Sequence, residues 1–309
     1  MTQRVLVTGG AGFIGSNLVR ALAARGDEVR VLDNFSTGNR ANLEGIDADI
    51  VEGELCSYER VHNAVRGTEI VYHLGALGSV PRSVQDPLTS SAVNVEGTLN
   101  VLLAARDEGV KRVVFASSTS VYGSSPSLPT REEEPPDPIS PYGVAKLAAE
   151  RYCVSFSRVY ESFESVVLRY FNVFGPRQSP FSQYAAAIPL FVQAIAAGEP
   201  IMIYGDGEQS RDFTYVDNVV DATLRAGETE GANGEIFNIA AGAPATVNSV
   251  ADTIGALLEK PVKRTHLPSR AGDIRDSWAD LSKSERMLGY RPAIALEEGL
   301  RRTIEFLRG

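Results

Sequence analysis

The glycine-rich turn after the first apolar segment constrains the fold of this chain more than any other feature. Residues 4–8 have the composition of a short β-strand, and they lead directly into TGGAGFIG, residues 8–15. A helix is predicted over residues 14–25, because Ile14, Leu18 and Leu22 recur at helical spacing. A strand, a glycine turn and a helix in this order begin a βαβ unit, which predicts a parallel sheet.

The same turn has the spacing of a dinucleotide-binding loop. Gly9 permits the tight turn, Gly12 lets the backbone approach a pyrophosphate, and Gly15 allows the helix to pack closely on the strand. The phosphates then lie at the helix N-terminus, where free N–H groups point. Asp33 ends the next predicted strand, 18 residues after Gly15, and a carboxylate there accepts ribose hydroxyls and repels a 2′-phosphate. The pattern therefore predicts an NAD site and disfavours NADP.

Strands and helices keep alternating up to about residue 170. A long amphipathic helix is predicted over residues 93–108. The further predicted strands cover residues 29–32, 50–51, 70–74, 112–116 and 166–170. Beyond Asn172 the alternation is lost, and loops rich in Gly, Pro and Tyr separate shorter elements. The predicted fold class is α/β, a Rossmann-type doubly wound parallel sheet with a smaller, mixed C-terminal substrate-binding lobe.

No flexible linker separates the two expected lobes, so they should pack tightly together. We expect residues 1–170, with about 211–240, to form the NAD-binding domain. Residues 171–210 and 241–309 should form the second lobe. A helix is predicted near the C-terminus, over residues 296–307.

Composition excludes several classes of partner. The net charge is −9, which disfavours binding to nucleic acid or to an anionic membrane. No apolar run reaches the roughly 18 residues of a membrane span, and the first strand begins too early for a signal peptide. Cys56 and Cys153 cannot build a disulfide framework and fit a reducing compartment. We expect a cytoplasmic protein.

Two further patterns carry reactive groups. Tyr142 and Lys146 are four residues apart, on one face of a predicted helix. An ammonium beside a phenol, close to a positive nicotinamide ring, lowers the pKa of the phenol and makes it a base near neutral pH. Ser117 and Ser118 follow a buried strand at its carboxyl end, where open α/β sheets bind their ligands.

With these motifs in this order, the chain resembles the extended short-chain dehydrogenase/reductases of the nucleotide-sugar epimerase/dehydratase group over nearly its whole length. The resemblance implies Tyr142 as the base, Lys146 as its electrostatic partner and ribose ligand, and Ser118 as the hydroxyl completing the catalytic set. Asn34, Ser36 and Thr37 fit a simple turn equally well. The cofactor residues that the resemblance adds are Phe13, Ile14, Asn34, Ser36, Thr37, Gly38, Leu55, Leu74, Gly75, Ala76, Asn94, Ser117 and Tyr170.

Residues 118–120 discriminate among the reactions of the group. At these positions the 4,6-dehydratases have a sequence like Thr-Asp-Glu, and the UDP-glucuronate decarboxylases usually carry glutamate in place of Ser120. This chain has Ser118, Thr119 and Ser120 instead. Three neutral hydroxyls are similar to the 4-epimerases. In that reaction Tyr142 takes the proton of the 4-hydroxyl, the 4-hydrogen leaves as hydride to NAD, and the 4-keto sugar rotates before hydride returns. NAD is regenerated in each turnover and should stay tightly bound.

The resemblance also implies the residues that bind a UDP-sugar. Asn172 and the two arginines Arg211 and Arg270 match residues that contact the diphosphate, for which the guanidinium fork is suited. Asp273 would bind the uridine ribose, and Tyr204 would lie against the uracil.

The sugar itself is matched by three segments similar to the UDP-N-acetylglucosamine 4-epimerases. Ser277 stands where a tyrosine would block an N-acetyl group, although a small residue there also permits unacetylated sugars. UDP-N-acetylglucosamine is favoured, UDP-glucose/UDP-galactose comes next, and UDP-glucuronate is third. The sugar-facing residues so implied are Gly78, Ser79, Thr119, Ser120, Gln178, Ala186 and Ser277.

Alternatives remain within and outside enzymes. A related nucleotide-sugar dehydratase or reductase, or a dehydrogenase that releases NADH, is the runner-up. An NAD-sensing scaffold on the same fold would be expected to lack the Tyr142/Lys146 pair. His62 and His266 occur singly, so no metal site is predicted, and His73 reads as a structural histidine. The resemblance also implies a homodimer formed by helices near residues 94–107 and 142–158.

Overall fold

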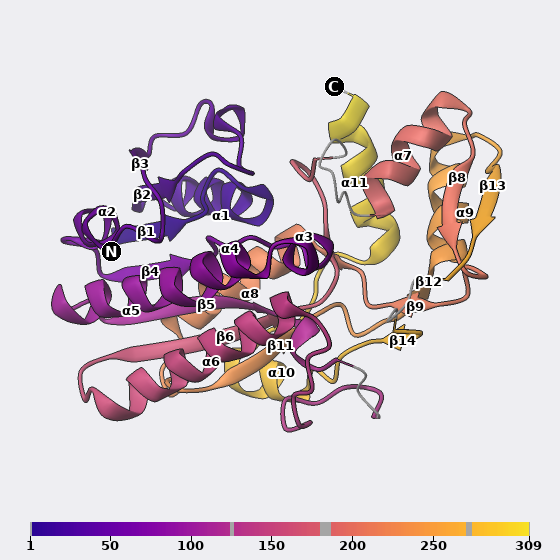
Figure 1. Ribbon diagram of the computed structural model, residues 1–309. Coiled ribbons are helices and arrows are strands. Elements are labelled where there is room, and N and C mark those ends of the chain that lie inside the picture. The colour runs from indigo at the N-terminus through magenta and orange to yellow at the C-terminus, as the bar shows by residue number, and fades with distance from the viewer. Residues whose placement is uncertain (1, 124–126, 180–186, 270–273, 309) are drawn as a thin grey trace.

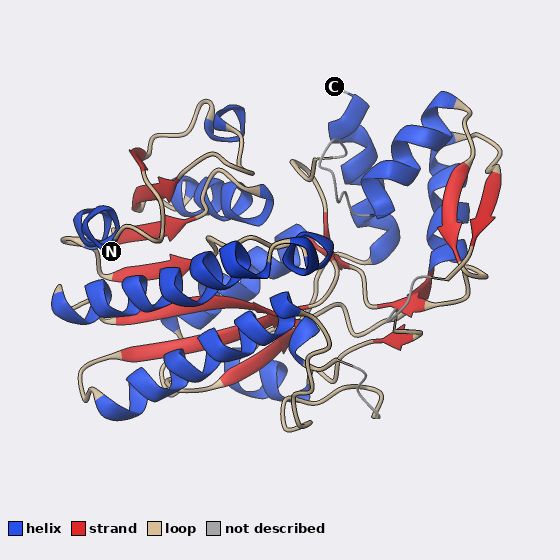
Figure 2. Ribbon diagram, in the orientation of Figure 1, coloured by secondary structure: helices blue, strands red, loops and turns tan. Residues whose placement is uncertain are grey.

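A computed structural model describes residues 2–123, 127–179, 187–269 and 274–308. Its centre is a seven-stranded sheet with the strand order β11-β6-β5-β4-β1-β2-β3, in which every neighbouring pair is parallel. The chain leaves β1 in one direction for β2 and β3, and later continues on the other side of β1 with β4, β5 and β6 (Figures 1 and 2). This reversal of strand order lies between β1 and β4. The strands are β1 (Arg4–Thr8), β2 (Glu28–Asp33), β3 (Asp49–Glu52), β4 (Ile70–His73), β5 (Arg112–Ser118), β6 (Glu164–Tyr170) and β11 (Ile236–Ile239).

Alternate residues of the buried strands pack on opposite faces of the sheet. Val5 and Val7 belong to the apolar cluster that includes residues of α1 (Phe13–Ala24) and α8 (Val216–Glu228). Leu6, between them, belongs to a second cluster with α2 (Tyr58–Val65), α5 (Gly97–Asp107) and α6 (Pro141–Val159). Both faces are therefore covered, which confirms the doubly wound α/β architecture and explains the continuous apolar runs in the sequence.

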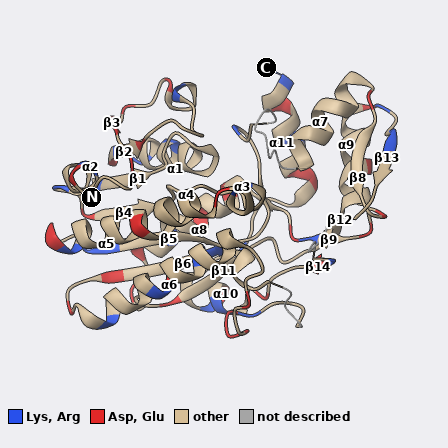
Figure 3. Cartoon of the chain, in the orientation of Figure 1, with Lys and Arg blue, Asp and Glu red and all other residues tan. Residues whose placement is uncertain are grey.

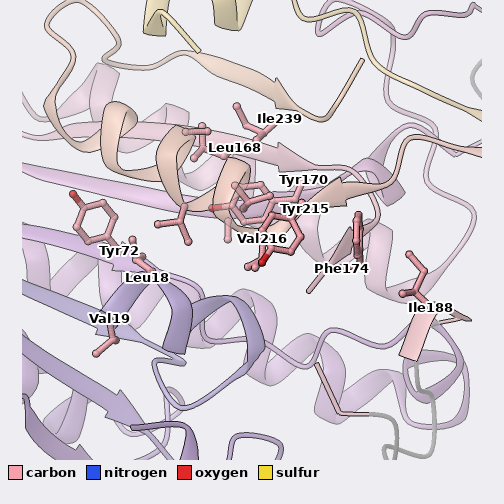
Figure 4. Close-up of a cluster of buried hydrophobic side chains, with 14 of the residues drawn as sticks. Leu18, Val19, Tyr72, Leu168, Tyr170, Phe174, Ile188, Tyr215, Val216 and Ile239 are labelled. Carbon is pink, nitrogen blue, oxygen red and sulfur yellow. The ribbon is translucent and has the colours of Figure 1, made fainter. Parts of the chain in front are cut away.

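The smaller lobe contains helices and short strands of mixed direction. Its core residues, among them Ile188, Val250 and Ile254, belong to the same apolar cluster as α1 and α8. Figure 4 shows Phe174, Tyr215 and Val216 between the sheet residues and Ile188, so the two lobes share one core. The elements are α7 (Ala187–Ala197), α9 (Val247–Leu258), α11 (Leu296–Arg308) and the strands β7 (Val173–Phe174), β8 (Ile201–Tyr204), β9 (Ser210–Arg211), β10 (Thr214–Tyr215), β12 (Ala245–Thr246), β13 (Arg264–Leu267) and β14 (Asp276–Ser277).

The strands of this lobe that the structure describes form three small sheets. β10 pairs with β7 and β13 with β8, both in parallel, and β9 lies between β12 and β14. β9 is antiparallel to β12 and parallel to β14, which confirms the mixed character expected of the C-terminal lobe. α10 (Ser282–Leu288) returns from this part of the chain to pack against β11 and α8 of the large lobe.

One predicted helix has a different form. Instead of a single helix over residues 93–108, α4 (Pro87–Ser91) continues through one π-helical turn, Ala92–Glu96, into α5. Within the described ranges, the remaining short helices are α3 (Val80–Gln85) and two 3₁₀ turns, Arg40–Leu43 and Thr119–Val121. A π turn inside a helix often marks a functional position, and this one contains Asn94.

The distribution of charge agrees with the sequence composition. In the orientation of Figure 3, acidic and basic residues occur on both lobes. Among the described residues, no helix combines the length and the apolar composition required to cross a bilayer.

Candidate active site

The glycine turn between β1 and α1 is packed so closely that Gly9 and Gly15 cannot be replaced. Gly9 has φ +69°, and a Cβ on it would lie 2.7 Å from Cα of Gly75. A Cβ on Gly15 would lie 2.1 Å from the carbonyl oxygen of Gly9. Gly12 is the N-cap of α1, and within the described chain no side chain caps this helix, so its first N–H groups remain directed outward. The turn thus leaves room for the pyrophosphate of a dinucleotide at the helix N-terminus.

Asp33 is fixed against this turn at the end of β2. Its Oδ2 accepts a 2.9 Å hydrogen bond from the N–H of Ala11, and its Oδ1 accepts one of 2.8 Å from the N–H of Phe35. Each carboxylate oxygen keeps a second lone pair, so the group can still accept from ribose hydroxyls. This arrangement supports the predicted preference for NAD.

The turn after Asp33 is held mainly by its own side chains. Oδ1 of Asn34 accepts from the backbone N–H of Ser36 at 3.1 Å and from its hydroxyl at 2.8 Å. A Cβ on Gly38 would lie 2.9 Å from the carbonyl carbon of Ala11, which brings residues 34–38 next to the glycine turn. Asn34 and Ser36 therefore serve the turn itself. A contact of Asn34, Ser36 and Thr37 with the cofactor remains a prediction.

His73 is a structural histidine, as expected. The N–H of Gly75 donates to Oγ1 of Thr8, so the Thr8 hydroxyl is free to donate to Nδ1 of His73 at 2.7 Å. Thr98 donates to the carbonyl of Asn94, and its oxygen therefore accepts from Nε2 of His73 at 3.0 Å. The proton of the ring thus lies on Nε2. Complete burial, aided by the nearby Lys146 ammonium, lowers the pKa of His73 to about 3.

The neighbouring cofactor candidates form a packed layer over β1. A Cβ on Gly75 would lie 2.9 Å from Cδ1 of Leu55 and 3.1 Å from Oγ1 of Thr8, so these three residues are in close contact. Leu74 and Ala76 flank Gly75 and are half-buried. The carboxamide of Asn94 bonds both the N–H and the carbonyl of Leu77, at 2.9 and 3.2 Å. Asn94 therefore fixes this loop.

The three predicted catalytic residues come together at the carboxyl end of β5. The Tyr142 hydroxyl hydrogen-bonds the side chain of Ser118. Nζ of Lys146 donates to the carbonyl of Ala116 at 2.9 Å and lies 6.0 Å from the centroid of the Tyr142 ring. The Ser118 hydroxyl also bonds that of Ser120, at 3.2 Å.

The start of α6 explains how Tyr142 reaches this place. Ser140 caps the helix by accepting from the N–H of Gly143 at 3.1 Å. A Cβ at position 143 would lie 2.5 Å from the carbonyl oxygen of Ser120, so only glycine lets the helix approach the 118–120 segment. Ser83 of α3 accepts from the backbone N–H of Tyr142 at 3.1 Å, which brings α3 to the same place.

The electrostatics of the pair differ from the expectation. Burial raises the pKa of Tyr142, and the hydrogen bond with Ser118 only partly opposes this, so the phenol is protonated at neutral pH. Burial also lowers the pKa of Lys146 to about 8. The predicted lowering of the phenol pKa depends on a nicotinamide ring beside Tyr142, and in the protein without cofactor burial acts in the opposite direction. A positive charge beside the phenol, such as a nicotinamide ring, would lower the pKa of Tyr142.

Tyr170, a predicted cofactor residue, faces the core. It is 6% exposed, and its hydroxyl bonds Oγ1 of Thr223 on α8 at 2.7 Å. Figure 4 shows it beside Tyr215 and Val216. The structure therefore does not direct its hydroxyl toward the Tyr142 cluster.

A pocket of about 380 Å³ lies in the smaller lobe. Three of the predicted substrate residues, Asn172, Tyr204 and Arg211, line it together with the apolar side chains of Phe191 and Ile203. Apolar walls with a few polar groups suit a flat, partly polar ring system. The structure thus collects residues that lie far apart in the sequence into one pocket.

The sugar-facing candidates lie around this pocket and around Tyr142. Ser277 is paired with Arg211 in the β14–β9 ladder. Gln178 donates through Nε2 to the carbonyl of Val173 at 3.1 Å, and its buried Oε1 has no hydrogen-bond partner among the described residues. Ser79 caps α3 by accepting from the N–H of Arg82 at 3.2 Å, and Gly78 before it is exposed.

Three predicted substrate residues, Ala186, Arg270 and Asp273, lie outside the described residues. One residue that the prediction did not include is Asp212, which is fully buried. Its carboxylate accepts from the N–H groups of Ala241, Gly242 and Ala279 at 2.8, 3.0 and 3.3 Å. It thereby ties β9, which carries Arg211, to two distant loops. The only signal in the sequence was an acidic residue directly after the candidate arginine.

The comparisons with known proteins agree with this geometry. A family model described as the NAD dependent epimerase/dehydratase family matches residues 5–240. A UDP-glucose 4-epimerase of Mycolicibacterium smegmatis is 40% identical over 316 aligned residues, which cover 99% of each chain.

Two solved structures superpose closely on the chain. The UDP-glucose 4-epimerase of Thermotoga maritima, determined with UDP-glucose, has a TM-score of 0.94 and 39% identity, covering 99% of this chain and 98% of the other. The UDP-N-acetylglucosamine 4-epimerase of Methanobrevibacter ruminantium, in complex with UDP-N-acetylmuramic acid, has a TM-score of 0.95 and 38% identity with the same coverage.

Proposed function

The chain belongs to the NAD-dependent epimerase/dehydratase family, and we propose that it inverts C4 of a UDP-hexose, with UDP-N-acetylglucosamine and UDP-N-acetylgalactosamine as the preferred pair. One observation carries the proposal: Tyr142, Ser118 and Lys146 meet at the carboxyl end of β5, among neutral hydroxyls. Such a group can move a proton at a sugar hydroxyl.

The neutral character of the cluster separates epimerisation from elimination. The hydrogen bonds of the Ser118 side chain run to Tyr142, to Ser120 and to the backbone N–H of Ser120. Thr119 lies in the same 3₁₀ turn and carries a hydroxyl as well. Loss of water from the sugar needs a positioned acid besides the base, and residues 118–120 offer none.

The catalytic residues divide the work at C4. With NAD bound, its positive ring would favour the phenolate of Tyr142, which would accept the proton of the 4-hydroxyl beside Ser118 and return it after the sugar has turned. Lys146 supplies a positive charge beside the phenol. It lies at the carboxyl edge of the sheet, the edge that also carries the glycine turn, and is therefore the candidate ligand of the cofactor ribose. Bound NAD supplies the hydride acceptor and donor, held by the α1 N-terminus and Asp33.

The pocket of the smaller lobe supports a nucleotide anchor. Apolar side chains and Tyr204 can hold a uracil ring, and Arg211 can bind a diphosphate. Anchoring the nucleotide at this pocket leaves the sugar free to rotate about its bond to the diphosphate. Both faces of C4 can then be presented to the same hydride donor.

Two residues favour an N-acetylated sugar. Oε1 of Gln178 lacks a donor among the described residues, and the side chain would have to turn this buried oxygen toward the sugar to accept from the N–H of an acetamido group. Ser277, beside Arg211, leaves more volume than a bulkier side chain would. UDP-glucose and UDP-galactose remain the second candidate pair, because the 40% identical relative is a UDP-glucose 4-epimerase.

We also propose a homodimer. Val84 of α3, Leu88 of α4 and Val144 and Val159 of α6 are exposed apolar side chains. Elements α3, α4 and α6 contact one another, so these side chains belong to neighbouring helices of one side of the fold. A second copy that covers α6 would remove this apolar surface from water.

The test is an assay of the purified protein with no added cofactor. UDP-N-acetylglucosamine and UDP-glucose are supplied in parallel, and proton NMR follows inversion at C4. Conversion to the 4-epimer, faster for the N-acetylated sugar, supports the proposal. A product that has lost water, or turnover only when NAD is added in stoichiometric amount, identifies a dehydratase or a dehydrogenase instead.

A further inference from the structure

A fully buried ion pair lies directly behind the catalytic residues. Nε and Nη2 of Arg169 donate to Oε1 and Oε2 of Glu150, at 2.9 and 2.8 Å. The two side chains are 1% and 0% exposed. Arg169 belongs to β6 and Glu150 to α6, so the pair joins the sheet to the helix that carries Tyr142 and Lys146.

The pair also contacts the end of β5. The hydroxyl of Ser117 donates to Oε1 of Glu150 at 2.5 Å. Ser117 precedes Ser118, the hydrogen-bond partner of Tyr142. Glu150 therefore fixes the strand end from which Ser118 projects, and it does so from the helix that presents Tyr142.

Stability alone does not account for such a pair. Burying two charges costs about as much as their attraction returns, and apolar replacements of buried pairs are often neutral or stabilising. A carboxylate retained at zero exposure, four residues from Lys146 on one helix, calls for a role toward a neighbouring charge.

Lys146 is the charge in question. The titratable groups that raise its pKa are Cys153 and Glu150 of α6, its own charge acts on His73 of β4, and Tyr142 lies beside it. Burial keeps three of these neutral near pH 7, because it lowers the pKa of His73 to about 3 and raises the pKa values of Cys153 and Tyr142. Glu150 is then the acid whose charge supports the ammonium against the desolvation that lowers its pKa.

We propose that Glu150 is a positioning residue of the catalytic site, whose carboxylate holds the Ser117–Ser118 strand end against Tyr142 and places a negative charge one helical turn from Lys146. Arg169 secures the carboxylate in this place by its two-point contact. The inference rests on the proposed 4-epimerase activity for its kinetic readout, but the charge of Lys146 can be measured without turnover.

The experiment compares Glu150→Gln with Arg169→Gln in the NAD-bound protein. The chain has five lysines, so the ¹³Cε resonance of Lys146 can be assigned with Lys146→Met and titrated by NMR. Glu150→Gln removes a negative charge and should lower the pKa of Lys146 by about one unit, whereas Arg169→Gln removes a positive charge and should raise it. The alkaline limb of kcat/KM should move in the same two directions, which gives about a tenfold loss of activity on that limb for Glu150→Gln. Shifts of equal sign in both variants, or no shift in Glu150→Gln, would overturn the proposal.

A matched control exists at the other end of the same two strands. Arg112 of β5 donates through Nε to Glu164 of β6 at 2.7 Å, at the amino end of the β5–β6 ladder. Glu164→Gln also breaks an arginine–glutamate pair, here between two strands and with a carboxylate that is 32% exposed, and it lies far along the strand from Ser118. It should lower the unfolding midpoint without moving the Lys146 titration. If Glu164→Gln shifted the pKa of Lys146 as much as Glu150→Gln does, general destabilisation would explain both shifts and the proposal would be rejected.

A double variant covers the case in which the single variants do not fold. Glu150→Gln/Arg169→Met removes both charges of the pair, so neither partner is left alone and the interior remains filled. The pKa of Lys146 should still fall, because Glu150 is one turn away on the same helix and Arg169 reaches this region from β6. An unchanged titration would reject the proposal. If the wild-type protein fails to epimerise any UDP-sugar while these NMR shifts are observed, the proposed function fails and the positioning role stands.

Discussion

The hydroxyl of Thr8, at the end of β1, bonds Nδ1 of His73, at the end of β4, at 2.7 Å. The bond spans the two strands between which the order of the sheet reverses, and it continues through Nε2 of His73 to Thr98 on α5. A neutral imidazole is required at the centre, because it must accept on one nitrogen and donate from the other. The edge of the sheet that presents the glycine turn is thus fixed by a histidine that stays uncharged.

This requirement predicts how stability depends on pH. The pKa of His73 is about 3 in the fold, against an ordinary value of 6.5 in the unfolded chain. Below about pH 6.5, His73 therefore binds a proton in the unfolded chain but not in the folded protein. The contribution of His73 to stability is present above that pH and is lost as the pH falls. Between pH 7.5 and 5.0, wild type should lose about 2 kcal/mol more unfolding free energy than His73→Gln. Urea denaturation at both pH values measures this, and equal losses would contradict it.

Lys146→Met should stabilise the fold while abolishing turnover. A pKa of about 8 in place of 10.5 means that the fold disfavours the ammonium, by about 3 kcal/mol at pH 7. The variant also loses the hydrogen bond to the Ala116 carbonyl, which reduces this gain in stability by about 1 kcal/mol. The variant should therefore gain roughly 2 kcal/mol in thermal unfolding of the cofactor-free protein, and the gain should shrink as the pH rises from 8 to 10.5. Lys111→Met, at an exposed position, should show no such gain. A variant less stable than wild type at pH 7 would contradict the prediction.

Tyr142→Phe should reduce turnover by about 10²–10⁴-fold. The substitution removes only the hydroxyl that bonds Ser118, and the ring that packs at the start of α6 remains. NAD should stay bound, which absorbance of the purified protein after denaturation can verify. Tyr152→Phe, on the exposed side of the same helix, is the control and should retain turnover. Near-normal activity of Tyr142→Phe would remove Tyr142 from the role of base.

The sequence predicted the large lobe well because its signals are local. Buried parallel strands are short apolar runs, and β1, β4 and β6 lie within two residues of the predicted ranges. The glycine turn is likewise one continuous segment whose spacing has a steric cause, seen in the 2.1 Å between a Cβ on Gly15 and the carbonyl of Gly9.

The features that sequence reasoning missed depend on contacts between distant segments. Asp212 receives N–H groups from residues 241, 242 and 279, and nothing near position 212 indicates those partners. The direction of the Tyr142 pKa depends on burial, which a four-residue spacing with Lys146 does not reveal. Strands of two residues, such as β9 and β14, are too short to have a periodic pattern.

The place of Ser277 leads to a test of sugar specificity. Ser277 and Arg211 are neighbours in the parallel β14–β9 pair, so their side chains lie on the same face of that small sheet. Arg211 lines the pocket of the smaller lobe, and a large side chain at position 277 must therefore occupy space beside it. Ser277→Tyr should reduce kcat/KM for UDP-N-acetylglucosamine at least about tenfold relative to UDP-glucose, because the bulkier sugar loses its room.

Ser277→Ala is the matched control for that substitution. It removes the hydroxyl without adding volume, so the ratio of the two kcat/KM values should stay close to that of wild type. The backbone contact of this position, in which the N–H of Asp212 donates to the carbonyl of Ser277 at 2.9 Å, is kept in both variants. A difference between Ser277→Tyr and Ser277→Ala therefore reports side-chain volume and not a change in the β9–β14 pairing. If Ser277→Tyr lowers activity equally on both sugars, position 277 does not control the volume available to the N-acetyl group.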